Sequence, residues 1–134
     1  MELKEIILMK ESILVIDDDK NMTRLLEVVL ETSYKATIAH TKDDALKSFT
    51  NFSYSAVILD LNLNEEDGFG LISAIRTKSK WLPIIILSGK EKSDDRIKCF
   101  KAGVDDYLIK PFNPEELKLR LERSIARHKL IESL

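Results

Sequence analysis

Four separated stretches of the sequence each place polar or charged side chains directly after a short apolar run. The stretches are "ILVIDDD", "AVILD", "PIIILS" and "DYLIK". They supply the carboxylates of Asp17, Asp18, Asp19 and Asp60, the hydroxyl of Ser88 and the ammonium group of Lys110. Brought together, such groups could bind a hard cation and a phosphoryl group.

Carboxylates held close together repel one another and raise each other's pKa unless a cation lies between them. An oxygen-only ligand set, without His or Cys at metal spacing, indicates a hard ion such as Mg2+, which keeps water and phosphate oxygens as further ligands. A lysine opposite that ion can neutralise phosphoryl oxygens. One carboxylate then remains as a nucleophile, and its attack on phosphorus gives an acyl phosphate.

Each of these residues, taken alone, also has a simpler structural interpretation. Asp19 precedes a predicted helix closely enough to be its N-cap. Ser88 before a glycine is typical of a turn, and Lys110 before a proline is typical of a solvated loop. N-capping requires neither a hydroxyl nor a lysine at neighbouring strand ends, so the combination favours a functional site.

The apolar runs predict five strands. They fall at residues 13–16, 35–39, 56–59, 84–87 and 106–109. The first, third and fourth are apolar on successive residues, which is typical of parallel strands covered on both faces. Ligands of an open parallel sheet bind beyond the carboxyl ends of its strands, where the four stretches place their polar groups.

Helical patterns separate the strands. Met22, Leu25, Leu26, Val29 and Leu30 form one apolar stripe of helical spacing. The predicted helix starts share capping residues, namely Asp19, Thr41 with Asp44, Asp67, Ser93, and Asn113 with Pro114. Gly103 is expected to end the fourth helix in the left-handed conformation. The alternation predicts an α/β domain of (βα)5 type.

The length, composition and net charge of the chain limit the classes of function that it can have. With 134 residues and 44% hydrophobic residues, the chain suits a single domain. A net charge of -2 predicts neither direct nucleic-acid binding nor attraction to an anionic membrane. The single cysteine, Cys99, cannot form an internal disulfide, and the first apolar run is too short for a signal peptide. We therefore expect a cytoplasmic location.

The motifs "VIDDD", "VILDLNLNEEDG", "IIILSG" and "AGVDDYLIKPF" resemble, in this order, the receiver domain of two-component response regulators. The resemblance covers residues 12–128. It implies a doubly wound, flavodoxin-like fold with a five-stranded parallel sheet in the order 2-1-3-4-5 and helices on both faces. Residues 1–11 would form an N-terminal extension, and residues 129–134 a tail or the start of a linker helix.

The same resemblance implies roles for the site residues. Asp60 matches the phosphoacceptor, and Asp17 and Asp18 match the acidic pair around Mg2+, with Mn2+ as an alternative ion. The backbone carbonyl of Asn62 would be a further metal ligand. Lys110 would pair with Asp60 and then with the phosphoryl group.

Two further sets of residues would carry the signal. Ser88 and Tyr107 match the hydroxyl and aromatic residues that couple phosphorylation to the output face. A charged set matches the dimer face formed by the fourth helix, fifth strand and fifth helix of this family, and comprises Arg96, Asp106, Glu116 and Arg120. The resemblance implies a switch, not a conventional enzyme, that is loaded by a histidine kinase or a phosphotransfer protein.

Two other functions compete with this interpretation. A receiver-like binding module could work without phosphorylation. Such modules typically lack one of five site residues that are all intact here, namely Asp17, Asp18, Asp60, Ser88 and Lys110. A Mg2+-dependent phosphohydrolase could use Asp17 and Asp19 as its Asp-x-Asp pair. That class of enzyme needs a substrate-capping insertion, for which this chain has no room.

Overall fold

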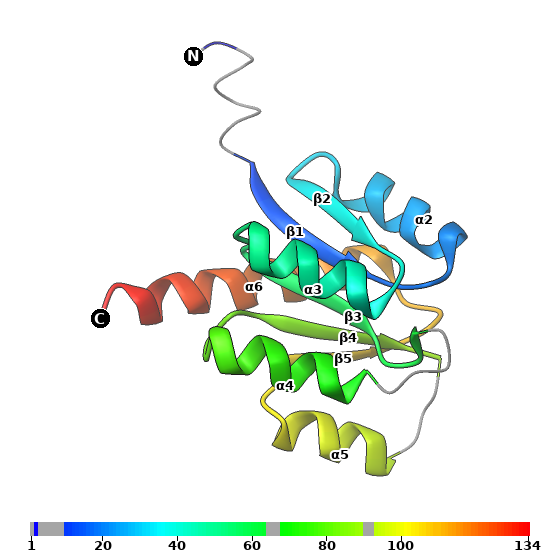
Figure 1. The fold of residues 1–134 in the computed structure, drawn as a ribbon. Coiled ribbons are helices and arrows are strands. Elements are labelled where there is room, and N and C mark those ends of the chain that lie inside the picture. The colour runs from blue at the N-terminus through cyan, green and yellow to red at the C-terminus, as the bar shows by residue number, and fades with distance from the viewer. Residues whose placement is uncertain (1, 3–9, 64–67, 90–92) are drawn as a thin grey trace.

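The computed structural model describes residues 2, 10–63, 68–89 and 93–134, except for the side chain of residue 93. Strands and helices alternate along the chain (Figure 1). The elements are β1 (Glu11–Ile16), α2 (Lys20–Leu30), β2 (Tyr34–Ala39), α3 (Lys42–Asn51), β3 (Ala56–Asp60), α4 (Phe69–Lys78), β4 (Ile84–Ser88), α5 (Ser93–Lys101), β5 (Asp106–Ile109) and α6 (Pro114–Glu132). Among the described helices, none has the length and apolar character needed to cross a membrane.

The strands form one parallel sheet in the order β2-β1-β3-β4-β5. Ile16 of β1 lies beside Leu59 of β3, and Ser88 of β4 lies beside Ile109 of β5. This register aligns the carboxyl ends of the central strands along one edge of the sheet. The predicted fold class, strand order and (βα)5 alternation are confirmed.

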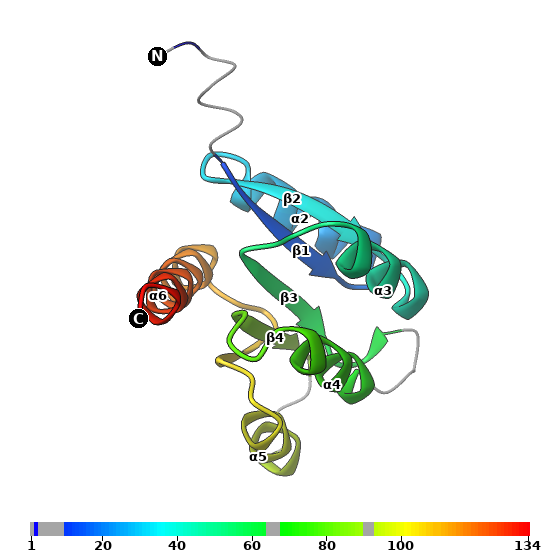
Figure 2. The same ribbon diagram turned by 60° about the vertical axis from the view of Figure 1, so that its left-hand side comes forward.

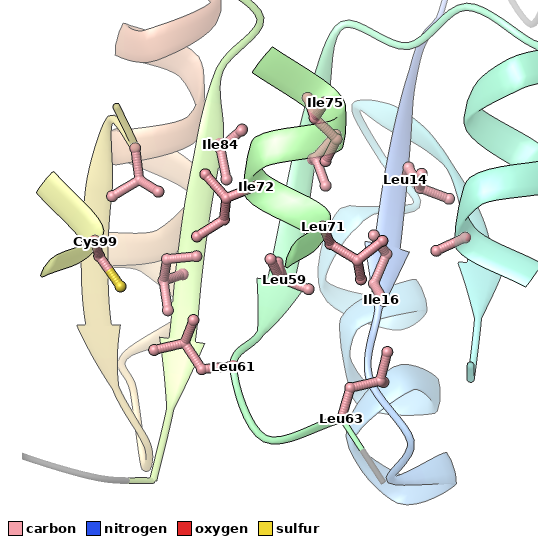
Figure 3. Packing of buried hydrophobic residues seen from close by; sticks show 14 of the residues in the cluster. Leu14, Ile16, Leu59, Leu61, Leu63, Leu71, Ile72, Ile75, Ile84 and Cys99 are labelled. Carbon is pink, nitrogen blue, oxygen red and sulfur yellow. The ribbon is translucent and has the colours of Figure 1, made fainter. Parts of the chain in front are cut away.

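Apolar side chains cover both faces of the sheet, because successive residues of a strand point to opposite sides. Leu14 and Ile16 pack on the face that carries α3, α4 and α5. Ile13 and Val15 pack on the other face, against α2 and α6. Figure 2 shows the two helical layers on either side of the sheet, and Figure 3 shows the packing of the first face.

Three predicted helix starts are confirmed by their side-chain hydrogen bonds. The carboxylate of Asp19, the hydroxyl of Thr41 and the amide oxygen of Asn113 each accept from backbone N–H groups in the first turn that follows. Pro114 is the first residue of α6, where its missing N–H group costs nothing. Gly103 has a φ of 95°, in the left-handed range expected for it.

The capping side chains predicted for the other two helices, Asp67 and Ser93, lie outside the described part of the structure. Asp67 lies outside the described residues, and α4 has Gly68 at its N-cap, without a side-chain capping bond. A side chain at position 68 would collide with the backbone, since an added Cβ would lie 2.9 Å from the carbonyl oxygen of Leu61. The helix α5 begins at Ser93, whose side chain is outside the described part.

The first strand and the last helix can be set beside the predicted domain limits. The strand β1 begins at Glu11, and α6 continues through Glu132, so the expected boundary at residue 128 falls inside a continuous helix. Lys129 of α6 forms an ion pair with Glu11. The division into extension, domain and tail stays a prediction.

Arg76 connects the end of α4 to the connection before β5. Its guanidinium group donates to the carbonyl oxygen of Gly103 at 3.0 and 2.7 Å, and to the carbonyl oxygen of Leu82 at 2.7 Å. It also lies 3.2 Å from the carboxylate of Asp105, which accepts from the backbone N–H of Ile84 at 2.8 Å. This cluster fixes the starts of β4 and β5 relative to α4.

Candidate functional site

The carboxyl edge of the sheet gathers the predicted site residues. Asp17 directly follows β1, Asp60 and Ser88 are the last residues of β3 and β4, and Lys110 directly follows β5. The backbone N–H of Lys110 donates to the carbonyl oxygen of Ser88 at 2.8 Å, which extends the pairing of β4 and β5 to this edge. The strand ends point toward the same side of the molecule in Figure 1.

Asp17 is buried and accepts two hydrogen bonds in the site. It is only 2% exposed. Its Oδ1 accepts from the backbone N–H of Asp19 at 2.9 Å, and its Oδ2 accepts from Lys110 Nζ at 2.8 Å. Asp18 is half-buried, and carboxylate oxygens of Asp17, Asp18 and Asp60 lie within 4.8 Å of one another.

Asp60 is 7% exposed. One of its carboxylate oxygens lies near a backbone N–H group and the other near an ammonium group. Oδ1 accepts from the backbone N–H of Asn62 at 3.1 Å, and Oδ2 lies 3.6 Å from Lys110 Nζ. Burial raises the pKa of this carboxyl above its ordinary value, and the charges of Asp17 and Asp18 act in the same direction. The hydrogen bond from Asn62 and the charge of Lys110 oppose the rise without cancelling it.

Lys110 is the cation of the site. Burial lowers the pKa of its ammonium group, but the hydrogen bonds and charges of Asp17 and Asp60 outweigh burial and raise the pKa above its ordinary value. Lys110 is therefore fully protonated at neutral pH. The peptide bond between Lys110 and Pro111 is cis.

The donor set fits a hard divalent cation. One ammonium group faces three carboxylates, so the cluster carries an excess of negative charge. All of its donors are oxygens, as Mg2+ requires, and they are close enough to share one ion. Asn62 is placed beside the cluster by its bond to Asp60. The role of its backbone carbonyl as a ligand stays a prediction.

Ser88 and Tyr107 lie in contact beneath the site. They are 1% and 5% exposed. Burial raises the pKa of the Tyr107 hydroxyl, and a hydrogen bond with Ser88 opposes that rise. The guanidinium carbon of Arg96 lies 5.6 Å from the centre of the Tyr107 ring. Tyr107 thus contacts both Ser88, at the end of β4, and Arg96 of α5.

The predicted dimer set is only partly clustered. Arg120 donates to both carboxylate oxygens of Asp106, at 3.0 and 2.8 Å, and lies 2.9 Å from Glu116 one turn away. These three residues form one intrachain ion-pair network on β5 and α6. Arg96 stands apart from them, on α5 and against Tyr107.

His40 is a site neighbour that the sequence reasoning missed. Its Nδ1 donates to the backbone carbonyl oxygen of Asp17 at 3.0 Å. The available signal was its position, because His40 directly follows β2 and β2 pairs with β1, so its side chain can reach the β1–α2 connection.

Comparisons with known proteins agree on one family. A family model described as "Response regulator receiver domain" matches residues 13–122. A probable transcriptional regulator, ycf27 of Porphyridium aerugineum, is 40% identical over 88% of this chain and 49% of its own length. The chain spans about half the length of the curated relatives it matches.

Solved structures of the same kind resemble it as well. The response regulator DrrB, an OmpR/PhoB homologue of Thermotoga maritima, has a TM-score of 0.81 at 31% identity, over 89% of this chain and 54% of that one. The receiver domain of the sensor histidine kinase PA1611 of Pseudomonas aeruginosa has a TM-score of 0.79 at 31% identity, over 87% and 98% of the two chains. That structure holds a magnesium ion coordinated in its active-site cleft.

Proposed function

This chain belongs to the response regulator receiver domain family, and we propose that it is a signalling switch activated by phosphorylation of Asp60. In this proposal a histidine kinase or a phosphotransfer protein supplies the phosphoryl group. The chain is a regulatory phosphoacceptor, whose own residues promote the transfer to and from Asp60, and not a conventional enzyme.

One observation carries the proposal, the placement of the Lys110 ammonium group between two buried carboxylates. It lies 2.8 Å from Asp17 and 3.6 Å from Asp60. The shorter contact anchors Lys110 on Asp17, so its charge stays in the site when Asp60 becomes modified. A positioned cation of this kind can neutralise phosphoryl oxygens as charge develops on them.

The proposed step is a displacement at phosphorus. A carboxylate oxygen of Asp60 forms a bond to phosphorus while the phosphorus–nitrogen bond of the donor phosphohistidine breaks, and the imidazole nitrogen leaves with the electron pair. Asp17, Asp18, Asp60 and the carbonyl of Asn62 would hold Mg2+, which supplies charge neutralisation for the phosphoryl oxygens. The excess of carboxylates over ammonium groups supports this assignment.

Ser88 and Tyr107 are proposed to pass the change to the output face. A phosphoryl group on Asp60 adds about 1.5 to 2 negative charges at neutral pH. The Ser88 hydroxyl can donate to a phosphoryl oxygen, a charge-assisted bond that contributes about 1.5 to 3 kcal/mol. Its contact with Tyr107, and the position of Arg96 over the Tyr107 ring, support a coupling that ends on α5.

We also propose that this output face, formed by α5, β5 and α6, joins two phosphorylated copies. The charged residues of the face are Arg96, Asp106, Glu116 and Arg120. Within one chain Arg120 already pairs with Asp106 and Glu116, so dimerisation would require these partners to be exchanged. Sedimentation of the phosphorylated chain tests this step, and a monomer at high concentration would contradict it.

Acetyl phosphate with Mg2+, followed by intact mass spectrometry, tests the central proposal. We expect the wild-type chain to gain one phosphoryl group and Asp60→Asn to gain none. Asp106→Asn, which changes a carboxylate outside the acidic cluster, should be phosphorylated like the wild type. If the wild-type chain gains no phosphoryl group, the proposal fails and a phosphorylation-independent binding module is favoured. Multiple turnover of unrelated phosphate esters would favour a phosphohydrolase.

A further inference from the structure

A shallow groove of about 200 Å³ lies between the carboxyl ends of α3 and α4. It is at the amino ends of the strands, whereas the acidic site is at their carboxyl ends. We call it the aromatic groove, and Phe49, Phe52, Tyr54, Lys78 and Leu82 are its main lining residues. Figure 1 shows the carboxyl ends of α3 and α4 on the same side of the sheet, away from the strand arrowheads. Nothing in the proposed phosphoryl chemistry uses this groove.

Large apolar side chains are exposed at the aromatic groove. Phe52 is 66% exposed although it directly follows α3. Trp81, one residue before Leu82, is 53% exposed. Aromatic surface exposed next to a groove is unfavourable in water and is typical of binding sites, because a partner removes it from solvent.

Two lysines are placed beside these rings. Lys78 Nζ donates to Thr50 Oγ1 at 3.0 Å and lies 6.0 Å from the centre of the Phe49 ring. Lys80 Nζ lies 5.1 Å from the centre of the Trp81 ring. Both lysines are exposed, so their charges remain available at the mouth of the aromatic groove.

The two chain segments that form the aromatic groove contain no acidic residue. Residues 45–59 and 68–89 include lysines and one arginine but neither Asp nor Glu. The arginine, Arg76, is occupied by backbone carbonyls and Asp105. Among the lining residues of the aromatic groove, the charge comes from Lys78, which is positive on a chain whose net charge is -2.

The exposed aromatic rings together with the two lysines favour one kind of binding partner over others. In a symmetric dimer the same patch meets itself, so Lys78 and Lys80 would face the same lysines of the second copy at an unfavourable like-charge contact. A nucleic acid would require a longer row of cations than these two. An acidic peptide segment that carries a large apolar side chain can cover the exposed rings and can pair its carboxylates with the two lysines.

We propose that the aromatic groove is a docking site for such an acidic, apolar-anchored peptide segment of a partner protein. The apolar side chain would cover Phe49 and Phe52, and flanking carboxylates would pair with Lys78 and Lys80. The groove lies at the amino ends of the strands and Asp60 at the carboxyl end of β3. A docked segment therefore leaves the phosphoryl site open.

Trp81 is the only tryptophan of the chain and provides the readout. The probe is a short synthetic peptide in which glutamates flank a central Leu-Phe pair, without tryptophan. The matched probe replaces every glutamate by glutamine. We expect a saturable change in Trp81 fluorescence with the acidic peptide and roughly tenfold weaker binding of the glutamine peptide. Added salt should weaken only the acidic peptide's binding.

Two variants locate the binding. We expect Phe52→Ser, and separately Lys78→Glu combined with Lys80→Glu, to weaken the acidic peptide roughly tenfold while far-ultraviolet circular dichroism stays native. The matched controls are Leu130→Ser, an exposed apolar residue of α6, and Lys35→Glu, an exposed lysine of β2, and both should bind like the wild type.

Three results would overturn the proposal. They are equal binding of the glutamine peptide, undiminished binding by both groove variants, and a Trp81 signal that depends on protein concentration without any peptide, which would indicate a second copy as the occupant. The unmodified chain is used throughout, so failure of this docking site and failure of phosphorylation at Asp60 are separate results.

Discussion

Replacing Asp60 by asparagine removes one of three carboxylates whose oxygens lie within 4.8 Å of one another. We expect the Asp60→Asn variant to be more stable than the wild type when no divalent cation is present. The asparagine amide oxygen can still accept the backbone hydrogen bond of Asn62, which lies 3.1 Å from Asp60 Oδ1. The change therefore isolates the charge of the acceptor residue.

The expected size follows from the distances in the site. At an effective dielectric constant of about 20, a carboxylate at the 4.8 Å limit of the cluster repels Asp60 by about 3.5 kcal/mol, and Lys110 Nζ at 3.6 Å attracts it by about 4.6 kcal/mol. The repulsions from Asp17 and Asp18 thus exceed the attraction by about 2 kcal/mol. Burial of the charge acts in the same direction. We expect a gain in the free energy of unfolding of about 1 to 3 kcal/mol.

The pH dependence has a definite sign. Burial and the two neighbouring carboxylates raise the pKa of Asp60 in the folded state above 3.8. The folded state therefore binds this proton more tightly than the unfolded state, and the wild type loses stability as the pH rises through the folded-state pKa. Asp60→Asn lacks this loss. Urea denaturation in EDTA should show a stability difference between the two proteins that grows as the pH rises above the ordinary Asp value of 3.8.

Two comparisons make the prediction refutable. Asp43→Asn, an exposed carboxylate in the first turn of α3, should change the free energy of unfolding by no more than about 0.5 kcal/mol. Saturating Mg2+ should stabilise the wild type more than Asp60→Asn, by mass action on the folded state. If Asp60→Asn is the less stable protein in EDTA at neutral pH, the proposed electrostatic conflict at the site does not exist.

Three further substitutions follow from the geometry. Lys110→Ala leaves the carboxylate cluster without its ammonium group, and we expect it to cost about 2 to 4 kcal/mol in urea denaturation and to prevent stable phosphorylation by intact mass. Arg76→Ala frees the carbonyl of Gly103, and we expect a loss of about 2 to 4 kcal/mol with phosphorylation retained. Asp19→Ala should cost about 0.5 to 2 kcal/mol through the lost helix cap, with unchanged Mg2+ affinity by calorimetric titration.

Most of the fold could be predicted because its signals are local. The apolar run from Ile13 to Ile16 has both faces buried, so a parallel strand was the natural interpretation. Asn113 and Pro114 mark the start of α6 through capping and a fixed φ. Strand ends then bring Asp17, Asp60 and Lys110 to one edge, since parallel strands all end on the same side.

Side-chain partners across the fold could not be predicted in the same way. The sequence motifs indicated that Lys110 pairs with Asp60, yet its shorter contact is with Asp17, at 2.8 Å compared with 3.6 Å. The bond from His40 to the Asp17 carbonyl likewise depends on the spacing of β1 and β2. These contacts are set by side-chain conformations and by strand register, which no short sequence pattern specifies.

The aromatic groove shows the same limit of local patterns. Phe52 and Lys78 belong to segments separated by β3 and by the connection to α4, and each alone is an ordinary surface residue. Only the packing of α3 beside α4 on one face of the sheet places them around a common groove.

The central claim is that Asp60 carries the phosphoryl group, and its most direct test locates the modification. The wild-type chain is phosphorylated with acetyl phosphate and Mg2+ and then treated with borohydride, which reduces an aspartyl phosphate to homoserine. Peptide mass spectrometry then reads the changed position. We predict homoserine at position 60 and an unchanged Asp17. Homoserine at any other carboxylate, with position 60 unmodified, would contradict the account.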